Sequence, residues 1–141
     1  MELLDKDLLS LQEVRTLIKN AKEAQKELAK MSQEQIDKIV KAIADAGYEN
    51  AEKLAKMANN ETGFGKWEDK IIKNVFASKM VYDSIKDVKT VGIINEDKEN
   101  KVLEIGVPMG VVAGLIPSTN PTSTVIYKAM ISIKAGNTIV F

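Results

Sequence analysis

The spacing of the apolar residues changes its period near Val88, and this change limits the fold more than any other feature of the sequence. Before it, apolar residues recur at steps of three and four, as on one face of an α-helix. After it come a pair of β-rich segments and then a strand–helix–strand pattern. We therefore predict an α/β chain with a helical region over 1–87, a β-hairpin over 88–109 and a β–α–β unit over 110–141.

Four helices are predicted in the first region. Ser32 and Gln35 have the spacing of a capping box that opens the second helix, and Gly47 is expected to end it. Asn50 is expected to cap the third helix, which should end near Gly63. The apolar stripe of the first helix, expected to face the core, consists of Leu11, Val14, Ile18 and Ala21. The stripe of the fourth, which follows Trp67, consists of Ile72, Val75, Phe76 and Met80.

The segments "VKTVGII" and "KVLEIGV" flank the polar stretch "NEDKEN", which predicts an antiparallel hairpin. Its strands lie outside the helical pattern. Both a projecting arm that pairs with another surface and an ordinary edge hairpin explain this pattern.

The last part of the chain predicts a β–α–β unit. "GVVAGLI" is continuously apolar, as in a strand buried on both faces, and "NTIVF" is expected to be a second buried strand. Between them, "PTSTVIYKAMISIKAG" is expected to form a helix that stops at Gly136. One face of this helix is expected to carry Val125, Ala129, Ser132 and Ile133.

The stretch "STNP", between the first of these strands and the helix, has two interpretations. Asn120 is a preferred N-cap residue and Pro121 is favoured at the first helical position, so the stretch could simply start a helix. In open parallel sheets, however, ligands bind beyond the carboxyl ends of the strands, where helix N-termini present free N–H groups. An N-cap asparagine that spends its oxygen on the helix keeps its NH₂ group free, as an oxyanion hole requires. The glycine fingerprint of a pyrophosphate cradle is absent.

The composition excludes several kinds of catalytic group, metal ligand and binding partner. The chain has no cysteine and no histidine, which excludes disulfides, thiolate or imidazole metal ligands, a cysteine nucleophile and a histidine base within these residues. No loop gathers carboxylates, so we predict no metal site. Basic and acidic residues both number 20, and this balance predicts no nucleic-acid partner. No apolar run approaches the roughly 20 residues that span a bilayer, so we expect no membrane segment and a cytoplasmic protein.

The stretch "GVPMGVVAGLIPSTNPTSTVIYKAMISIKAGNTIVF" closely resembles the start of the cofactor domain in CoA-acylating aldehyde dehydrogenases, the acetaldehyde and propionaldehyde dehydrogenases. The upstream "AEKLAKMANNETGFGKWEDKIIKN" and "KTVGIINEDKENKVLEIGVP" look like the helical lead-in and hairpin of the same family, so the resemblance covers nearly all of the chain. It implies N-terminal helices, a hairpin that belongs to a homo-oligomerisation arm, and the first β–α–β of a Rossmann-like cofactor domain. It also implies a reaction in which an aldehyde, CoA and NAD⁺ give acyl-CoA and NADH through a cysteine thiohemiacetal and thioester.

The resemblance also implies site residues. Ile116 and Pro117 are expected near the nicotinamide ribose, with Ser118 and Thr119 in the same cofactor-binding loop. In the wider superfamily, the asparagine of a Pro-Trp-Asn-x-Pro motif donates to the oxyanion. Laid on that motif without a gap, Thr119 takes the asparagine position and Asn120 falls one place later, a shift that the CoA-acylating branch shares. We expect Asn120 to be the oxyanion donor, with Thr119 as a further contributor.

The family's nucleophilic cysteine lies far downstream of the residues matched here, so we expect this chain to be the front part of an enzyme and inactive alone. Its open strand edges predict self-association in isolation. Two other functions stay open from the residues alone. One is a non-catalytic helical and hairpin module that binds a partner, and the other is a nucleotide-binding domain unrelated to aldehydes.

Overall fold

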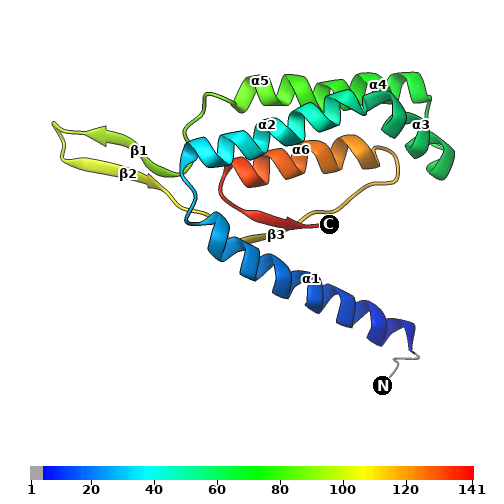
Figure 1. The fold of residues 1–141 in the computed structure, drawn as a ribbon, viewed down its shortest axis with the longest axis horizontal. Helices are drawn as coiled ribbons and strands as arrows, with labels where there is room; N and C mark the ends of the chain where they lie inside the picture. Colours follow the sequence, from blue (N-terminus) through cyan, green and yellow to red (C-terminus); the bar gives the residue numbers. More distant parts are fainter. Residues whose placement is uncertain (1–4) are drawn as a thin grey trace.

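The computed structural model describes residues 5–141; residues 1–4, the start of the predicted 1–87 region, lie outside the described residues. Helices come first and strands follow, as the change of period predicts (Figure 1). In chain order the elements are α1 (Lys6–Leu28), α2 (Gln33–Glu49), α3 (Ala51–Thr62), α4 (Trp67–Val75), the π-helical turn η1 (Phe76–Met80), α5 (Val81–Ile85), β1 (Gly92–Asp97), β2 (Val102–Gly106), β3 (Val111–Ala113), α6 (Pro121–Lys134) and β4 (Thr138–Val140).

The core lies between α2, α6 and the continuous α4–η1–α5 rod, which run side by side in Figure 1. Helix α2 begins with the predicted capping box: Ser32 accepts from the backbone N–H of Gln35, whose side chain accepts from the N–H of Ser32. This fixes the start of α2, and its apolar face then packs on α6 and η1. The fully enclosed side chains of the core include Ile36, Val40, Ala44, Ala77, Ile126 and Met130.

Gly47 does not end α2, contrary to the prediction, because the helix continues to Glu49 and Gly47 is buried inside it. A Cβ atom at this position would lie 3.0 Å from Cγ2 of Ile126 and 3.2 Å from Cβ of Ser78. The glycine therefore permits α2 to approach α6 and η1 closely. Asn50 follows at the start of α3, but its side chain donates to the carbonyl of Ala46 and caps no N–H group.

The apolar stripe of α1 does not face the core, again contrary to the prediction. Leu11, Val14 and Ile18 are exposed, and only the last turns of this helix reach the rest of the molecule. There Leu28 joins the core, while Gln25 donates to the carbonyl of Gly136 and accepts from the backbone N–H of Thr138. The rest of α1 projects away in Figure 1, because the described part of the chain offers no surface to cover it.

The fourth predicted helix exists and begins at Trp67, but its predicted stripe is largely on the outside. Ile72, Phe76 and Met80 are exposed, whereas Lys70, Asn74 and Ser78 are buried. Burial of these polar groups is tolerated because each is hydrogen-bonded. Apolar spacing alone therefore indicated the wrong face.

The hairpin is confirmed: β1 and β2 pair antiparallel, with an irregularity between Ile93 and Asn95. Figure 1 shows it extending away from the helical layer. Its apolar side chains are exposed, among them Ile93, Ile94, Val102, Leu103 and Ile105.

The β–α–β unit is confirmed as well, since β3 and β4 pair in parallel and α6 connects them. The first strand is shorter and more open than predicted: it ends at Ala113, and Leu115 beyond it is 83% exposed. On α6 the most buried side chains include Thr124, Ile126 and Met130, of which none belongs to the predicted face; Ser132 does, and it is buried. Gly136, with a left-handed φ of 73°, follows the end of α6 as predicted.

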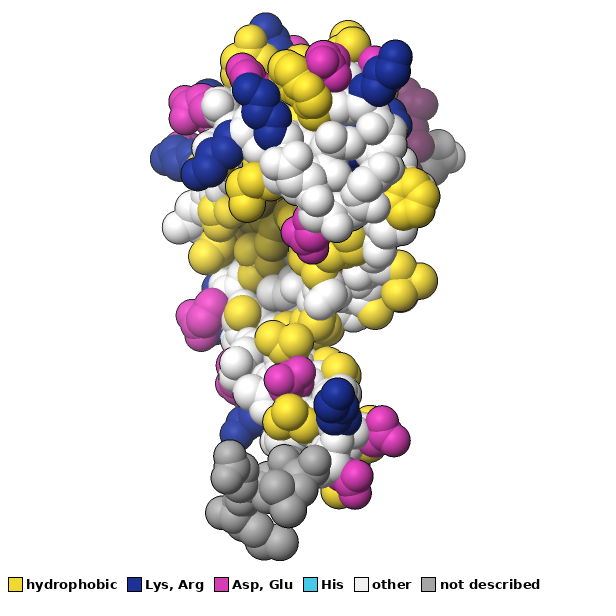
Figure 2. All heavy atoms as spheres, turned by 90° about the vertical axis from the view of Figure 1, so that its right-hand side faces the viewer, with side chains coloured by type: hydrophobic (Ala, Val, Ile, Leu, Met, Phe, Trp, Pro, Cys, Tyr) yellow, Lys and Arg dark blue, Asp and Glu magenta, His cyan; other side chains and the backbone are white. Residues whose placement is uncertain are grey.

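Apolar surface remains open on the described residues. Figure 2 shows hydrophobic side chains gathered in the hollow between α1, at the bottom of the view, and the helical layer above it. A pocket of about 420 Å³ between α1 and β4 is lined by residues that include Leu17, Ala21, Ala24, Ile139 and Phe141. Within residues 5–141, no helix is both long and apolar enough to cross a membrane.

Candidate functional site

The stretch between β3 and α6 places Asn120 directly before the first turn of α6. Pro121 is the first residue of the helix, and the backbone N–H of Thr124 donates to the carbonyl of Asn120 at 3.2 Å, so the predicted helix start is confirmed. The predicted side-chain cap is wrong. Asn120 makes no capping bond, because its Oδ1 accepts from Nζ of Lys73 at 2.8 Å.

Two lysines from successive turns of α4 hold this stretch. Nζ of Lys70 donates to the carbonyl of Thr119 at 2.7 Å, and Nζ of Lys73 binds the neighbouring Asn120 side chain. Lys70 is only 5% exposed, whereas Lys73 is exposed. Both are charge-assisted hydrogen bonds, which are stronger than bonds between neutral groups. They fix the backbone and the side chain of the stretch separately.

A second connection runs through Asn74. Its Oδ1 accepts from the hydroxyl of Thr122 at 2.9 Å, and its Nδ2 donates to the carbonyl of Ala51. The first turn of α6 is thereby tied to α4 and to the start of α3. Sequence reasoning missed Lys70, Lys73 and Asn74. The available signal was a polar stripe at helical spacing, on a helix that we judged by its apolar residues.

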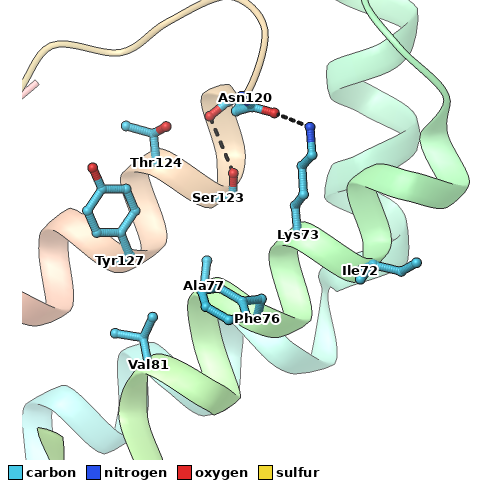
Figure 3. A pocket seen from close by; sticks show the side chains of 9 residues that line it. All are labelled: Ile72, Lys73, Phe76, Ala77, Val81, Asn120, Ser123, Thr124 and Tyr127. Atoms are coloured by element: carbon cyan, nitrogen blue, oxygen red, sulfur yellow. Dashed lines mark hydrogen bonds between the residues drawn. The ribbon is translucent and has the colours of Figure 1, made fainter. Parts of the chain in front are cut away.

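A pocket of about 540 Å³ lies between α6 and the α4–η1–α5 rod (Figure 3). Asn120 and Lys73 lie at one end of it, and Tyr127 and Val81 lie toward the other. Its walls are mainly apolar apart from the end at Asn120. The lining residues are Ile72, Lys73, Phe76, Ala77, Val81, Asn120, Ser123, Thr124 and Tyr127.

The π-helical turn η1 shapes one wall of this pocket. It contributes Phe76 and Ala77, and it begins where α4 ends. Ser78, inside the turn, donates to the carbonyl of Asn74 at 2.7 Å, which satisfies an acceptor near the change of helix type. Single π-helical turns within α-helices often occur at functional sites.

The remaining predicted residues lie elsewhere. Ile116, Pro117 and Ser118 are exposed and line a different pocket of about 300 Å³, together with residues of α3 such as Met57 and Glu61. The structure therefore brings Asn120 and Thr119 together but separates Asn120 from the other three. Thr119 lies between Ser118 and Asn120 in sequence, and its Oγ1 accepts from Nδ2 of Asn120 at 3.4 Å.

No group of three or more acidic side chains that could hold a metal ion occurs among residues 5–141. The arrangement can instead supply neutral N–H donors beside an apolar pocket. Such donors suit the stabilisation of a developing oxyanion.

Comparisons with known proteins agree on one family. The profile of the aldehyde dehydrogenase family matches residues 5–141. The bifunctional aldehyde-alcohol dehydrogenase AdhE of Escherichia coli K12 is 46% identical over 129 residues, which are 92% of this chain and 14% of that protein. This chain therefore spans only a small part of the relatives it matches.

Solved structures give the same result. A probable aldehyde dehydrogenase from Listeria monocytogenes EGD-e is 74% identical with a TM-score of 0.96, over 97% of this chain and 30% of that one. An acetylating aldehyde dehydrogenase from Geobacillus thermoglucosidasius is 62% identical with a TM-score of 0.96, over 99% of this chain and 31% of that one. The arrangement of α1 to β4 is thus shared with larger proteins of this kind.

Proposed function

This chain belongs to the aldehyde dehydrogenase family, and from this premise we propose that it is the N-terminal part of a CoA-acylating aldehyde dehydrogenase. The whole enzyme converts an aldehyde, CoA and NAD⁺ into acyl-CoA and NADH. In this proposal residues 1–87 form a helical region, residues 88–109 an oligomerisation arm, and residues 110–141 the first part of a Rossmann-like domain. The thiol chemistry belongs to other parts of the enzyme, since these 141 residues contain no cysteine.

The position of the Asn120 amide carries this proposal. Its oxygen accepts from Lys73, and within residues 5–141 its NH₂ group makes only the long contact with Thr119. The amide can therefore donate to a substrate oxygen at the end of the apolar pocket. The pocket walls from Ile72, Phe76 and Val81 suit the hydrocarbon part of an aldehyde.

We propose that the nucleotide binds at the residues that precede Asn120, which line a different pocket from the one beside its amide. Ile116, Pro117 and Ser118 are exposed beyond the carboxyl end of β3, and the adjoining helix begins at Pro121. Ligands of open parallel sheets bind in this position. When bound there, NAD⁺ would accept a hydride, and CoA would accept the acyl group. We expect Ile116 to Thr119 to hold the nicotinamide half of the dinucleotide.

The hairpin supports a homo-oligomer. Its two strands pair only with each other among the described residues, and both carry exposed apolar side chains, including Ile93 and Ile105. An exposed strand edge is a template for pairing with another chain. In this proposal the β1–β2 arm pairs with a second copy of the enzyme.

The test measures NADH formation by the full-length protein with a small aldehyde, with and without CoA. We expect activity that requires CoA. Asn120→Ala should lower kcat by about 100- to 1,000-fold, which is the usual cost of losing one oxyanion donor. Thr119→Val, which removes the neighbouring hydroxyl, distinguishes the two candidate donors and should have a smaller effect than Asn120→Ala.

Each negative result would contradict a different part of the proposed function. Aldehyde oxidation that ignores CoA would show that the acylating assignment is wrong. A larger loss for Thr119→Val than for Asn120→Ala would move the donor to Thr119. A full-length protein with no aldehyde activity would favour the non-catalytic module that binds a partner.

A further inference from the structure

We infer that Lys73 is a positioning residue for the proposed reaction. Its ammonium group fixes the orientation of the Asn120 amide, so that the NH₂ group, and not the oxygen, can donate a hydrogen bond to the substrate in the pocket. This inference rests on the proposed function. It names a residue on α4 that acts through the Asn120 amide, at the same end of the pocket.

The chemistry of the two groups selects the amide orientation. The terminal torsion of an asparagine side chain is broad and roughly two-fold, so rotation of the amide can exchange the positions of its oxygen and its NH₂ group. An ammonium group has three donors and no acceptor, so at 2.8 Å it can face only the oxygen of Asn120. The other contact of the amide, with Oγ1 of Thr119 at 3.4 Å, cannot make this choice, because a hydroxyl both donates and accepts.

Lys70 completes the arrangement from one turn earlier on α4. Its buried ammonium holds the carbonyl of Thr119 at 2.7 Å, so the backbone before Asn120 is fixed independently of the side chain. Loss of Lys73 should therefore free the amide without releasing the stretch itself. Lys73 is exposed, so its replacement also leaves the core intact.

The charge of Lys73 should also strengthen the donor. A hydrogen bond to an ionised partner polarises the amide, and chains of hydrogen bonds reinforce one another. The Asn120 NH₂ group would then donate to the negatively charged substrate oxygen while the amide oxygen is bound to the Lys73 ammonium group. No proton moves in this scheme; the amide keeps both of its hydrogens.

The experiment compares three variants of the full-length protein. Lys73→Met removes both the charge and the donor, while Lys73→Gln keeps an N–H donor without the charge. Lys79→Met is the control, because Lys79 is an exposed lysine on the following turns that contacts the Tyr48 ring and not the stretch at Asn120. The kinetic constants kcat and KM for the aldehyde are measured for each variant.

We expect Lys73→Met to lower kcat by about 10- to 100-fold with little change in KM, because only transition-state stabilisation is lost. Lys73→Gln should recover part of the loss, and Lys79→Met should behave as the unchanged protein. A wild-type kcat in Lys73→Met, or a rise in KM alone, would overturn the inference. A wild-type protein without aldehyde activity would overturn the proposed function instead.

A crystal structure of Lys73→Met gives a readout that does not depend on activity. The Asn120 side chain should leave its position at the end of the pocket, while the carbonyl of Thr119 stays on Lys70. An Asn120 side chain that neither moves nor exchanges its oxygen with its NH₂ group, at a resolution that distinguishes the two atoms, would show that Lys73 does not position it.

Discussion

Buried polar side chains hold the stretch that carries Asn120, and each has a partner for its hydrogen-bonding groups. Asn74 is 1% exposed and uses both ends of its amide, one on Ala51 and one on Thr122. Over residues 5–141, no buried side-chain nitrogen or oxygen lacks a hydrogen-bond partner. Since an unpaired buried polar group costs about 1–3 kcal/mol, this pairing favours one arrangement of α3, α4 and α6.

Gly47 provides a test of packing at a single position. Gly47→Ala should lower the free energy of unfolding by about 1–3 kcal/mol, because the new Cβ would crowd Ile126 and Ser78. In an exposed helix interior the same change would instead stabilise by roughly 0.5–1 kcal/mol. Urea unfolding of the full-length protein measures the difference.

The double variant Gly47→Ala with Ile126→Val is the control for crowding. Removal of one methyl group from Ile126 should recover part of the loss. A neutral or stabilising Gly47→Ala would contradict the crowding of this position by Ile126 and Ser78.

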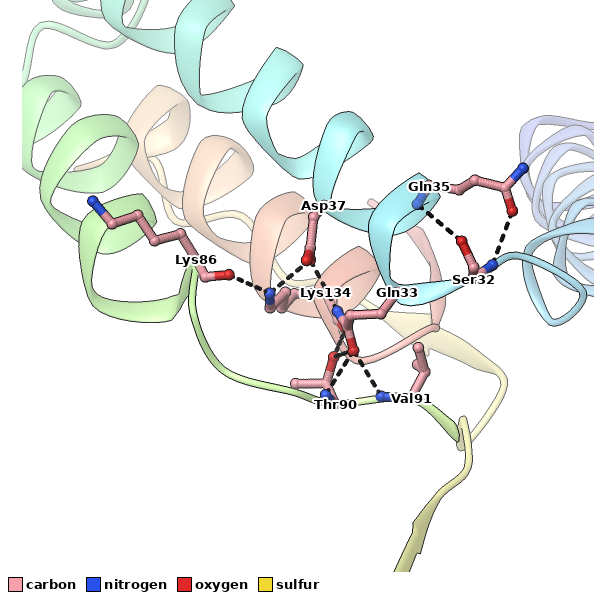
Figure 4. A network of polar contacts seen from close by, with 8 residues as sticks. All are labelled: Ser32, Gln33, Gln35, Asp37, Lys86, Thr90, Val91 and Lys134. Atoms are coloured by element: carbon pink, nitrogen blue, oxygen red, sulfur yellow. Dashed lines mark hydrogen bonds and ion pairs between the residues drawn. The ribbon is translucent and has the colours of Figure 1, made fainter. Parts of the chain in front are cut away.

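At the scale of elements, a polar network joins the root of the hairpin to the helical layer (Figure 4). Oε1 of Gln33 accepts from the backbone N–H groups of Thr90 and Val91, at 2.8 and 3.1 Å, and its Nε2 donates to Asp37. Asp37 in turn pairs with the buried Lys134 at 2.6 Å. Nζ of Lys134 also donates to the carbonyl of Lys86, where α5 ends. The first turns of α2 and the end of α6 thus anchor the chain just before β1.

Gln33→Leu tests this anchor. It should lower the free energy of unfolding by about 1–3 kcal/mol, because two partly buried N–H groups lose their acceptor. The amide protons of Thr90 and Val91 should then exchange faster with solvent, which hydrogen exchange measures. Gln35→Leu is the matched control, since that side chain only completes the capping box on the exposed surface. Unchanged exchange at Thr90 and Val91 would contradict the role of Gln33.

The turn between β1 and β2 should depend on pH. The side chain and the backbone N–H of Asn100, together with the N–H of Glu99, donate to the carboxylate of Asp97 and lower its pKa. A lowered pKa in the folded state means that the contribution to stability is present above the pKa of the unfolded chain. It is lost as the pH falls through the pKa of the folded state.

NMR titration of the backbone amides of Glu99 and Asn100 checks this dependence. Both signals should change together at a pH below the usual range of an aspartate. They should lose that transition in Asp97→Asn, which keeps the shape of the side chain but removes its charge. A transition at or above the usual aspartate range would contradict the hydrogen-bonded turn.

In the molecule as a whole, several apolar surfaces remain open among the described residues. They include the stripe of α1, the outer stripe of α4 and η1, the faces of the hairpin and the surroundings of the β3–β4 pair. Two strands with open edges form a weak sheet on their own. We therefore expect the isolated 141-residue chain to self-associate.

Size-exclusion chromatography with light scattering tests this expectation. The apparent mass should exceed that of a monomer and rise with concentration. Ile105→Lys on the hairpin and Leu11→Lys on α1 place the same charge on two different surfaces, so they identify which one drives association. A monodisperse monomer that unfolds cooperatively would contradict the prediction.

Local patterns in the sequence were sufficient to predict the order and the type of most elements. The change of period near Val88 separated helices from strands, and local signals placed the start of α2 at Ser32 and the start of α6 at Asn120. These features depend on residues close together in the chain, such as a cap and the N–H groups that it can reach. The family was also recognisable from contiguous residues of the last segment.

The buried faces of the helices and the partners of the polar groups could not be predicted in this way, because they depend on contacts between distant segments. The sequence around Gly47 predicts the end of a helix. In the folded chain, Ile126, which is 79 residues away in sequence, packs beside Gly47 instead. The sequence around Lys70 and Asn74 does not indicate their partners, which are the carbonyl of Thr119 and the hydroxyl of Thr122. The amide of Asn120 likewise takes its orientation from Lys73, a partner on another helix. A local pattern cannot specify such partners, because hydrogen bonding and packing depend on segments that are brought together only when the chain folds.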